Sequence, residues 1–148
     1  MDLGLDGRRI LVGGASRGLG AAIAEAAAAE GARIAAVARP SDELTATADR
    51  IGGIAIPGDL GALDAPAEVA HRAIEALGGL DGLVVNSGGP PAGTFAQLDD
   101  ATWAKAIDGT LLAAIRLIRA CLPALRDGVD PAIVIVLSSS VREPIPGL

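Results

Sequence analysis

The residues best suited to chemistry are three glycines, Gly14, Gly18 and Gly20, which follow an apolar run and open an alanine-rich segment. Glycine lets a backbone turn tightly and approach a phosphate, and a helix that begins there directs unpaired N–H groups toward it. An apolar strand, a glycine-rich turn and a helix in this order are typical of dinucleotide-binding proteins, although the G-x-x-x-G-x-G spacing differs from G-x-G-x-x-G. The pattern predicts a pyrophosphate-binding turn, and a glycine-rich turn without a ligand is the alternative.

Short apolar runs alternate with helical patterns along the whole chain, and these elements must position the turn. We expect strands at residues 9–13, 33–38, 53–57, 82–86 and 132–138, and helices at residues 19–30, 42–51, 65–77 and 99–126. Alternating strands and helices indicate βαβ units with right-handed crossovers. The predicted fold is a single α/β domain over residues 1–148, a Rossmann-type doubly wound parallel sheet of order 3-2-1-4-5.

The fifth strand of this sheet raises a physical problem. Residues 133–137 form a continuous apolar run, which is typical of a strand buried on both faces. In the expected order, however, the fifth strand lies at an edge, and the first two helices leave one face of the fourth and fifth strands bare. A long apolar edge beside an uncovered face favours aggregation. We therefore expect the sheet to be truncated after its fifth strand, with the 148 residues ending inside a larger fold.

The composition argues against several classes of protein. A formal net charge of −6 argues against nucleic acid as a partner, because phosphate contacts need clustered cations. Mean hydropathy is high, at +0.47, but glycines and charges interrupt every apolar run before the roughly 18 residues that a membrane span needs. The N-terminus lacks a signal-peptide pattern, and a single cysteine, Cys121, cannot form an internal disulfide or a cysteine metal cluster. We expect a cytoplasmic protein without a metal site.

Five segments in order resemble the short-chain dehydrogenase/reductase family. Gly13–Gly20 is similar to the family's T-G-x-x-x-G-x-G segment, and Asp59-Leu60 follows the third strand, where the family places an aspartate beside adenine. Asn86-Ser-Gly-Gly89 resembles the family's N-N-A-G, Trp103 lies on the following helix, and Ser138 ends the fifth strand where the catalytic serine belongs. The N-S-G-G variant is similar to a subgroup of 3-oxoacyl-carrier-protein reductase-like proteins. The resemblance implies hydride transfer between a nicotinamide cofactor and a carbonyl.

The resemblance also implies which residues would contact the cofactor and the substrate. The cofactor contacts would be Gly14, Ser16, Arg17, Gly18, Leu19, Arg39, Asp59, Leu60, Asn86 and Gly88. Asn86 could instead be a strand-end residue that bonds its neighbours. Ser138 would orient a substrate oxygen, and the alternative is a polar strand end in which Ser138, Ser139 and Ser140 open a turn.

The choice of cofactor can be argued from charge. An NAD site usually has an acidic residue after the second strand, which bonds the ribose hydroxyls and repels a 2′-phosphate. Here that position holds Ala38, followed by Arg39, and Arg17 lies in the glycine-rich turn. Two guanidinium groups favour NADP through charge-assisted hydrogen bonds. NAD is the second choice, with Arg39 in solvent and Asp42 reaching the ribose.

The chain departs from the family at the catalytic centre. The family uses a tyrosine as general acid and a lysine beside it, but this chain has no tyrosine, and its single lysine, Lys105, precedes Ser138. Counting from Trp103, Thr110 takes the place of the family's helical asparagine. We expect this chain alone to bind NADP without turning over substrate. The alternatives are a non-catalytic NADP-binding module or pseudoenzyme subunit, and the determined part of a longer enzyme.

The helix expected at residues 99–126 is apolar on more than one face, through Ile107, Leu111, Ile115 and Ile118. In the family that the chain resembles, this helix forms a dimer interface. We expect a homo-oligomer through this helix, and cover by a further helix is the alternative.

Overall fold

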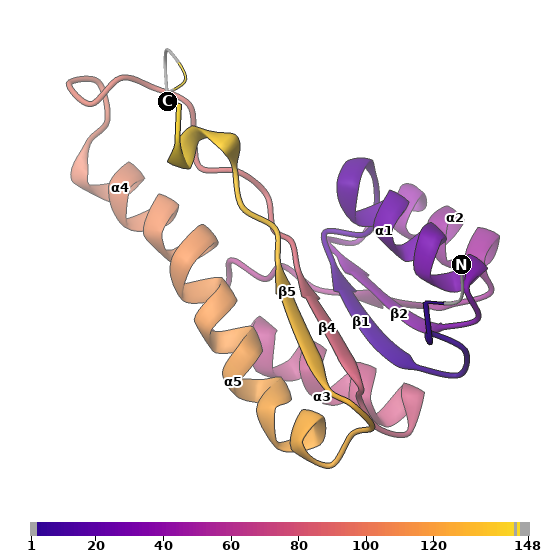
Figure 1. Ribbon diagram of the computed structural model, residues 1–148. Coiled ribbons are helices and arrows are strands. Elements are labelled where there is room, and N and C mark those ends of the chain that lie inside the picture. Colours follow the sequence, from indigo (N-terminus) through magenta and orange to yellow (C-terminus); the bar gives the residue numbers. More distant parts are fainter. Residues whose placement is uncertain (1–2, 144, 146–148) are drawn as a thin grey trace.

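A computed structural model describes residues 3–143 and 145 of the chain. Its five strands form one parallel sheet of order β3-β2-β1-β4-β5 (Figure 1). The strands are β1 (Arg9–Gly13), β2 (Arg33–Ala38), β3 (Ile54–Pro57), β4 (Gly82–Val85) and β5 (Ala132–Ile135). The predicted fold class and strand order are therefore confirmed.

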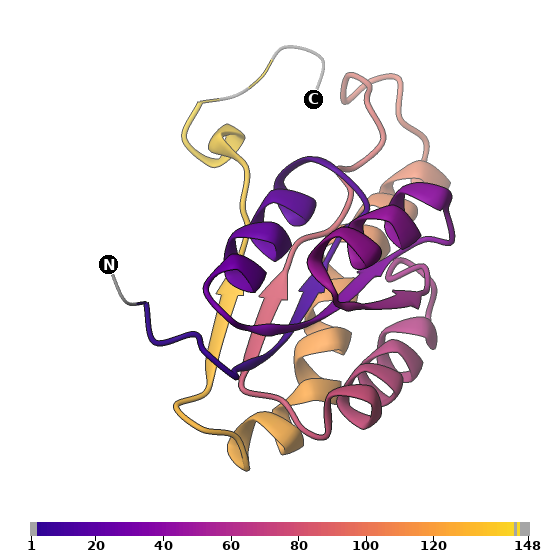
Figure 2. The same ribbon diagram turned by 90° about the vertical axis from the view of Figure 1, so that its right-hand side faces the viewer.

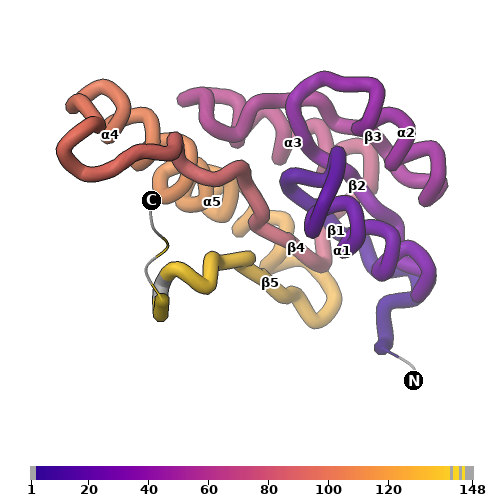
Figure 3. The backbone as a smooth tube through the Cα atoms, turned by 90° about the horizontal axis from the view of Figure 1, so that it is seen from above, coloured from indigo at the N-terminus to yellow at the C-terminus, as the bar shows by residue number. Residues whose placement is uncertain are grey.

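Helices cover both faces of the sheet. They are α1 (Gly18–Ala29), α2 (Asp42–Ile51), α3 (Ala65–Leu77), α4 (Asp100–Ile107) and α5 (Ala113–Arg126), with a π-helical turn, η1 (Asp108–Leu112), between α4 and α5 and a short 3-10 turn, η2 (Ser139–Val141), after β5. In Figure 2, α1 lies in front of the strands and α3 and α5 lie behind them. The view from above in Figure 3 has α1 and α2 on the opposite side of the sheet from α5.

Alternation along the strands divides the core into two layers. In β1, Leu11 packs with the side that α3 and α5 cover, whereas Ile10 and Val12 pack with the side that α1 and α2 cover. Leu11 and Val12 are both fully buried, as a central strand with helices on both faces requires. Because β1 pairs with β2 on one side and β4 on the other, the strand order reverses beside it and opens a crevice at the carboxyl ends.

The edge strand β5 corrects one expectation. The apolar run 133–137 is not buried on both faces: Ile133, Val134, Ile135 and Leu137 are 38%, 55%, 48% and 74% exposed. The strand pairs with β4 along one side only, and within the described part of the chain its residues belong to neither buried layer of the core. The helices that cover the faces of β1 therefore do not bury the side chains of β5. The expected edge position is confirmed.

The helix predicted at residues 99–126 is divided by the π-helical turn η1. The Thr110 hydroxyl donates to the carbonyl oxygen of Ala106 at 2.6 Å, four residues earlier, where it competes with the regular backbone bond. Arg116 Nη2 bonds Asp108 Oδ1 at 2.9 Å across the same turn. Side-chain hydrogen bonds of this kind are invisible to hydrophobic periodicity, which explains why a continuous helix was predicted.

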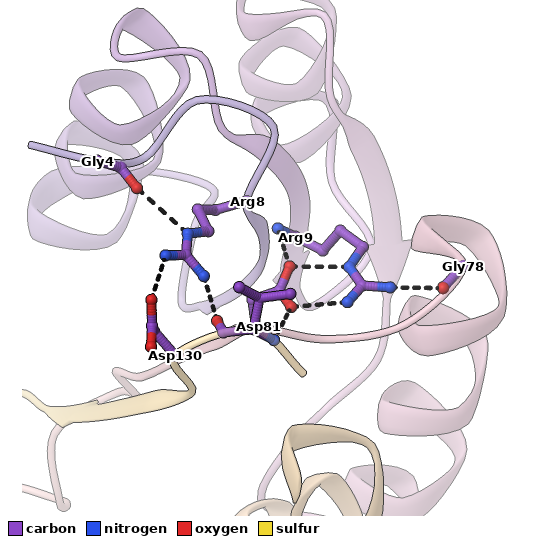
Figure 4. Close-up of polar contacts among 7 residues, drawn as sticks. Gly4, Arg8, Arg9, Gly78, Asp81 and Asp130 are labelled. Carbon is purple, nitrogen blue, oxygen red and sulfur yellow. Dashed lines mark hydrogen bonds and ion pairs between the residues drawn. The ribbon is translucent and has the colours of Figure 1, made fainter. Parts of the chain in front are cut away.

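The amino ends of the central strands are joined by the carboxylate of Asp81, which is 5% exposed (Figure 4). Its Oδ2 accepts hydrogen bonds from the backbone N and Nε of Arg9 at 2.9 and 2.8 Å, and its Oδ1 accepts from Arg9 Nη2 at 2.7 Å and Val129 N at 2.8 Å. Arg8 extends the connection by donating to Asp130 Oδ2 at 3.0 Å and to the Val129 carbonyl. One buried charge therefore fixes β1, β4 and the segment before β5 against each other.

Candidate cofactor site

A hollow of about 1320 Å³ lies at the carboxyl ends of the strands, where the loops after β1, β2, β3 and β4 meet. Its lining includes nine of the ten predicted cofactor contacts: Gly14, Ser16, Arg17, Gly18, Arg39, Asp59, Leu60, Asn86 and Gly88. These residues come from four separate loops, and the strand order brings them to one place. This position, at the point where the strand order reverses, is the usual ligand site of an open α/β sheet.

The glycine-rich turn fits tightly against the end of β4. Gly14 has a φ of +61°, and a Cβ there would lie 2.5 Å from Asn86 Nδ2. A Cβ on Gly20 would lie 2.2 Å from the Gly14 carbonyl oxygen, so α1 can begin this close to the turn only with glycine. Asn86 Nδ2 also donates to the Gly13 carbonyl at 3.2 Å. Asn86 therefore fixes the turn as well as lining the hollow.

The N-terminus of α1 faces this hollow with its backbone donors free of local side chains. Arg17 is the N-cap and makes no side-chain capping bond, and the first turn carries no acidic residue. The first N–H groups of a helix have no intrahelical acceptor, and the helix dipole adds partial positive charge at the same end. The turn and helix together can accept a phosphate group.

Charged side chains of both signs surround the outer part of the hollow. Arg17 and Arg39 line it, and so does Glu43, whereas Asp42 does not. The pKa of Glu43 is lowered, because its carboxylate bonds the Glu43 backbone N–H and the Ser41 side chain. The positive charge of Arg17 lowers this pKa further. Sequence reasoning missed Glu43, although an acidic residue in the first turn after β2 is the signal that could have identified it.

The end of α4 and the π-helical turn η1 add residues that the sequence did not single out for cofactor binding. Lys105, Asp108 and Gly109 line the hollow together with Thr110. The Thr110 hydroxyl is already bonded to Ala106, and Asp108 is paired with Arg116. π-Helical turns are often found at functional sites.

Two predicted site residues lie outside the lining of the hollow. The Leu19 side chain is 67% exposed; as the second residue of α1, Leu19 could reach a ligand through its backbone N–H. Ser138 is exposed beyond the end of β5, where its Oγ accepts from Ser140 N at 3.1 Å and Ser140 Oγ at 2.8 Å. The strand-end turn that was the alternative for Ser138 is therefore present, and its role in orienting a substrate stays a prediction.

Comparison with known proteins decides the family. The sequence pattern of the short chain dehydrogenases matches residues 8–148. The chain belongs to this family. Ketoacyl reductase HetN of Nostoc sp. is 35% identical over 146 residues, which are 95% of this chain and 51% of that relative. The chain spans about half the length of the curated relatives it matches.

Solved structures of the short-chain dehydrogenases agree with the fold and include cofactor complexes. A short chain dehydrogenase from Burkholderia cenocepacia in complex with NADP is 35% identical, with a TM-score of 0.89 over 97% of this chain and 60% of that one. L-Sorbose reductase from Gluconobacter frateurii, complexed with NADPH and L-sorbose, is 30% identical, with a TM-score of 0.89 over 99% of this chain and 58% of that one.

The described residues of this short-chain dehydrogenase lack both a membrane-spanning helix and a metal-binding cluster. Within residues 3–143 and 145, no helix is long and apolar enough to cross a bilayer. The same residues contain no cluster of histidine, cysteine and acidic side chains that could hold a metal ion.

Proposed function

We propose that this chain binds NADP in the hollow and provides the cofactor-binding part of an oxidoreductase that acts on a small-molecule carbonyl such as a 3-oxoacyl group. The observation that carries the proposal is that Arg17 and Arg39 both line the hollow, while Ala38 stands where an NAD site usually has an acidic residue. Guanidinium groups bind a 2′-phosphate through charge-assisted hydrogen bonds. NAD is the second choice, because Glu43 in the same lining would suit a ribose diol better than a phosphate.

The geometry of the turn fits a bound dinucleotide. When bound, the nicotinamide would supply or accept the hydride. Gly14 and Gly18 would let the backbone approach the pyrophosphate, and the free N–H groups at the start of α1, including that of Leu19, would bond it. The residues proposed to contact the adenosine and nicotinamide parts are Ser16, Arg17, Arg39, Asp59, Leu60, Asn86 and Gly88. Ser138 would orient the oxygen of the substrate carbonyl.

We further propose that this chain alone does not turn over substrate, because it has no tyrosine to act as the family's general acid. A non-catalytic NADP-binding module is the second candidate function. Thr110 favours this second candidate. Its hydroxyl donates to the Ala106 carbonyl at 2.6 Å, and a threonine side chain has no amide group with which to replace the family's asparagine.

We also propose that two copies associate through the helix pair α4 and α5. Trp103, Ile107, Leu111 and Ile115 recur every four residues and are 40%, 47%, 57% and 40% exposed. Side chains four apart share one face of a helix, so these residues form a continuous apolar stripe across η1. A cytoplasmic location stays a prediction from the sequence.

The test of cofactor choice is calorimetric titration of the chain with NADP⁺ and NAD⁺ at one fixed ionic strength, repeated on Arg39→Glu. We expect the affinity for NADP⁺ to fall about tenfold or more, because a hydrogen bond to a charged group contributes about 1.5–3 kcal/mol. The affinity for NAD⁺ should change little. Arg33→Glu is the matched control, since it makes the same change of charge at the exposed opposite end of β2. Equal losses for both cofactors would contradict the proposed 2′-phosphate site.

A further inference from the structure

A buried hydroxyl on α2 bonds the backbone of the glycine-rich turn. Thr47 is 1% exposed, and Thr47 and Asp81 are the two buried polar or charged residues of the part of the chain that the structure describes. Its Oγ1 donates to the carbonyl oxygen of Ser16 at 3.3 Å, thirty-one residues away. Ser16 lies in the turn between β1 and α1, so the bond joins α2 to the proposed phosphate-binding segment.

The hydroxyl is itself held by a pair of charges that connects α1 with α2. Arg50 Nη2 donates to Thr47 Oγ1 at 3.3 Å, and Arg50 bonds Glu25 Oε1 through Nε at 2.9 Å and Nη2 at 2.5 Å. Since the hydroxyl oxygen accepts from Arg50, its one hydrogen is directed to the Ser16 carbonyl. Glu25, Arg50, Thr47 and Ser16 thus form a continuous chain of hydrogen bonds.

The Ser16 carbonyl belongs to the same planar peptide unit as the N–H of Arg17. Because that unit is rigid, holding the oxygen fixes the orientation of the whole plane and the position of the Arg17 Cα. Together with the extended φ of −163° at Arg17, this sets the direction in which the Arg17 side chain leaves the turn. A second hollow of about 400 Å³ is lined by Ser16, Arg17, Thr47 and Arg50, among others. Side chains leave this space beside the peptide unfilled, and the Thr47 hydroxyl provides a side-chain hydrogen bond to the turn on that side.

We propose that Thr47 is a positioning residue that aims Arg17 at the 2′-phosphate of NADP. This inference rests on the proposed function and deepens it, because it gives the preference for the phosphorylated cofactor a second determinant outside the cofactor hollow. Thr47 does not line that hollow, whereas Arg17 does. The burial of α2 does not need the hydroxyl, because Leu44 and Ala48, 2% and 3% exposed, anchor the helix and Ser41 caps it.

The test compares four ligands on each variant: NADP⁺ and NAD⁺, and their adenosine fragments 2′,5′-ADP and 5′-AMP. Thr47→Val keeps the shape of the side chain and removes the hydroxyl. We expect the affinity for NADP⁺ and 2′,5′-ADP to fall about threefold to tenfold, with unchanged affinity for NAD⁺ and 5′-AMP. Thr47→Ser, which retains the hydroxyl, should restore most of the preference. Thr45→Val, an exposed threonine on the same helix, is the matched control and should leave all four affinities unchanged.

A second variant covers the case in which Thr47→Val does not fold. Arg50→Gln removes an exposed guanidinium that is 54% accessible, so folding should be retained, and it leaves the hydroxyl free to rotate away from Ser16. It should reduce the preference for NADP⁺ over NAD⁺ in the same direction as Thr47→Val, but by less.

The outcomes separate this inference from the proposed function. If the unaltered chain prefers NADP⁺ and both variants keep that preference, Thr47 has only a structural role and the inference is wrong. Equal loss of all four ligands in Thr47→Val also contradicts it, because a disordered turn would affect both cofactors alike. If the unaltered chain shows no preference for NADP⁺, the proposed function itself fails, and the inference fails with it.

Discussion

The change Asp81→Asn tests how much one buried carboxylate contributes to the stability of the sheet. The carboxylate accepts four hydrogen bonds, three from Arg9 and one from Val129, while only 5% of the residue is exposed. An asparagine amide has one oxygen where the carboxylate has two, so at least one donor loses its acceptor and the Arg9 guanidinium loses its counter-charge. Breaking a buried ion pair by removing one partner costs about 3–5 kcal/mol, and we expect the lower end, about 3 kcal/mol, because the Arg9 side chain is 23% exposed. That is a large part of the roughly 5–15 kcal/mol that stabilises an ordinary domain.

Urea unfolding followed by circular dichroism measures this loss. With an m-value of about 2 kcal/mol per molar urea, a loss of about 3 kcal/mol lowers the midpoint by roughly 1.5 M. Asp130→Asn is the control, because Asp130 forms an ion pair with Arg8 but its side chain is 87% exposed. Exposed pairs of this kind contribute under about 1 kcal/mol. Similar midpoints for the two variants would refute the reasoning.

The Asp81 carboxylate should also make the free energy of unfolding depend on pH. Hydrogen bonds from Arg9, which outweigh the cost of burial, hold the pKa of Asp81 well below its usual 3.8. The ionised form is therefore favoured by folding, and its contribution is present above about pH 4 and is lost as the pH falls through the folded-state pKa. The free energy of unfolding should decline below pH 4 in the unaltered chain and decline less steeply in Asp81→Asn. Parallel pH profiles would show that other carboxylates cause the acid loss.

Two further predictions concern the turn and the core. Gly20→Ala places a Cβ 2.2 Å from the Gly14 carbonyl oxygen, a backbone atom that cannot move without opening the turn. The affinity for NADP⁺, measured by titration, should therefore fall more than tenfold. Unchanged affinity would show that the turn adapts. Burial raises the pKa of the Cys121 thiol to about 12, so iodoacetamide at pH 8 should leave the folded chain unmodified and label it only in guanidinium chloride. Intact mass measures the labelling. Rapid labelling of the folded chain would contradict the buried position of Cys121.

The fold was predictable where the signals are local. The apolar run of β1, the glycines after it and the alanine-rich α1 are adjacent in sequence, and their order alone indicates a βα unit. The apolar run of β5 is by itself typical of a buried strand, and only its place at the edge of the predicted strand order indicated that it would be exposed. The π-helical turn η1 also escaped prediction, since the side-chain bonds of Thr110 and Arg116 that accompany it have no signature in hydrophobic periodicity.

The candidate site was predictable in outline and less so in detail. The strand ends that carry Gly14, Asp59 and Asn86 must meet once the strand order is known, because parallel strands end at the same edge of the sheet. Neighbouring side chains on a helix point about 100° apart, so which of them faces that edge depends on how the helix is rotated about its axis. The sequence does not give this rotation to within one residue. For this reason the NAD alternative named Asp42 as the ribose contact, whereas Glu43 is the acidic residue of α2 that lines the hollow.

The strand order has a consequence for the chain while it is being synthesised. Strand β1 is central in the folded sheet, but its two neighbours are made at different times, since β2 ends at Ala38 and β4 ends at Val85. At an elongation rate of about 5–20 residues per second, the ribosome needs roughly 2–10 seconds to add that stretch. During this interval one side of Ile10, Leu11 and Val12 is an unpaired apolar edge on the nascent chain. A strand that is paired on both sides in the finished protein thus carries one open apolar edge during part of its synthesis.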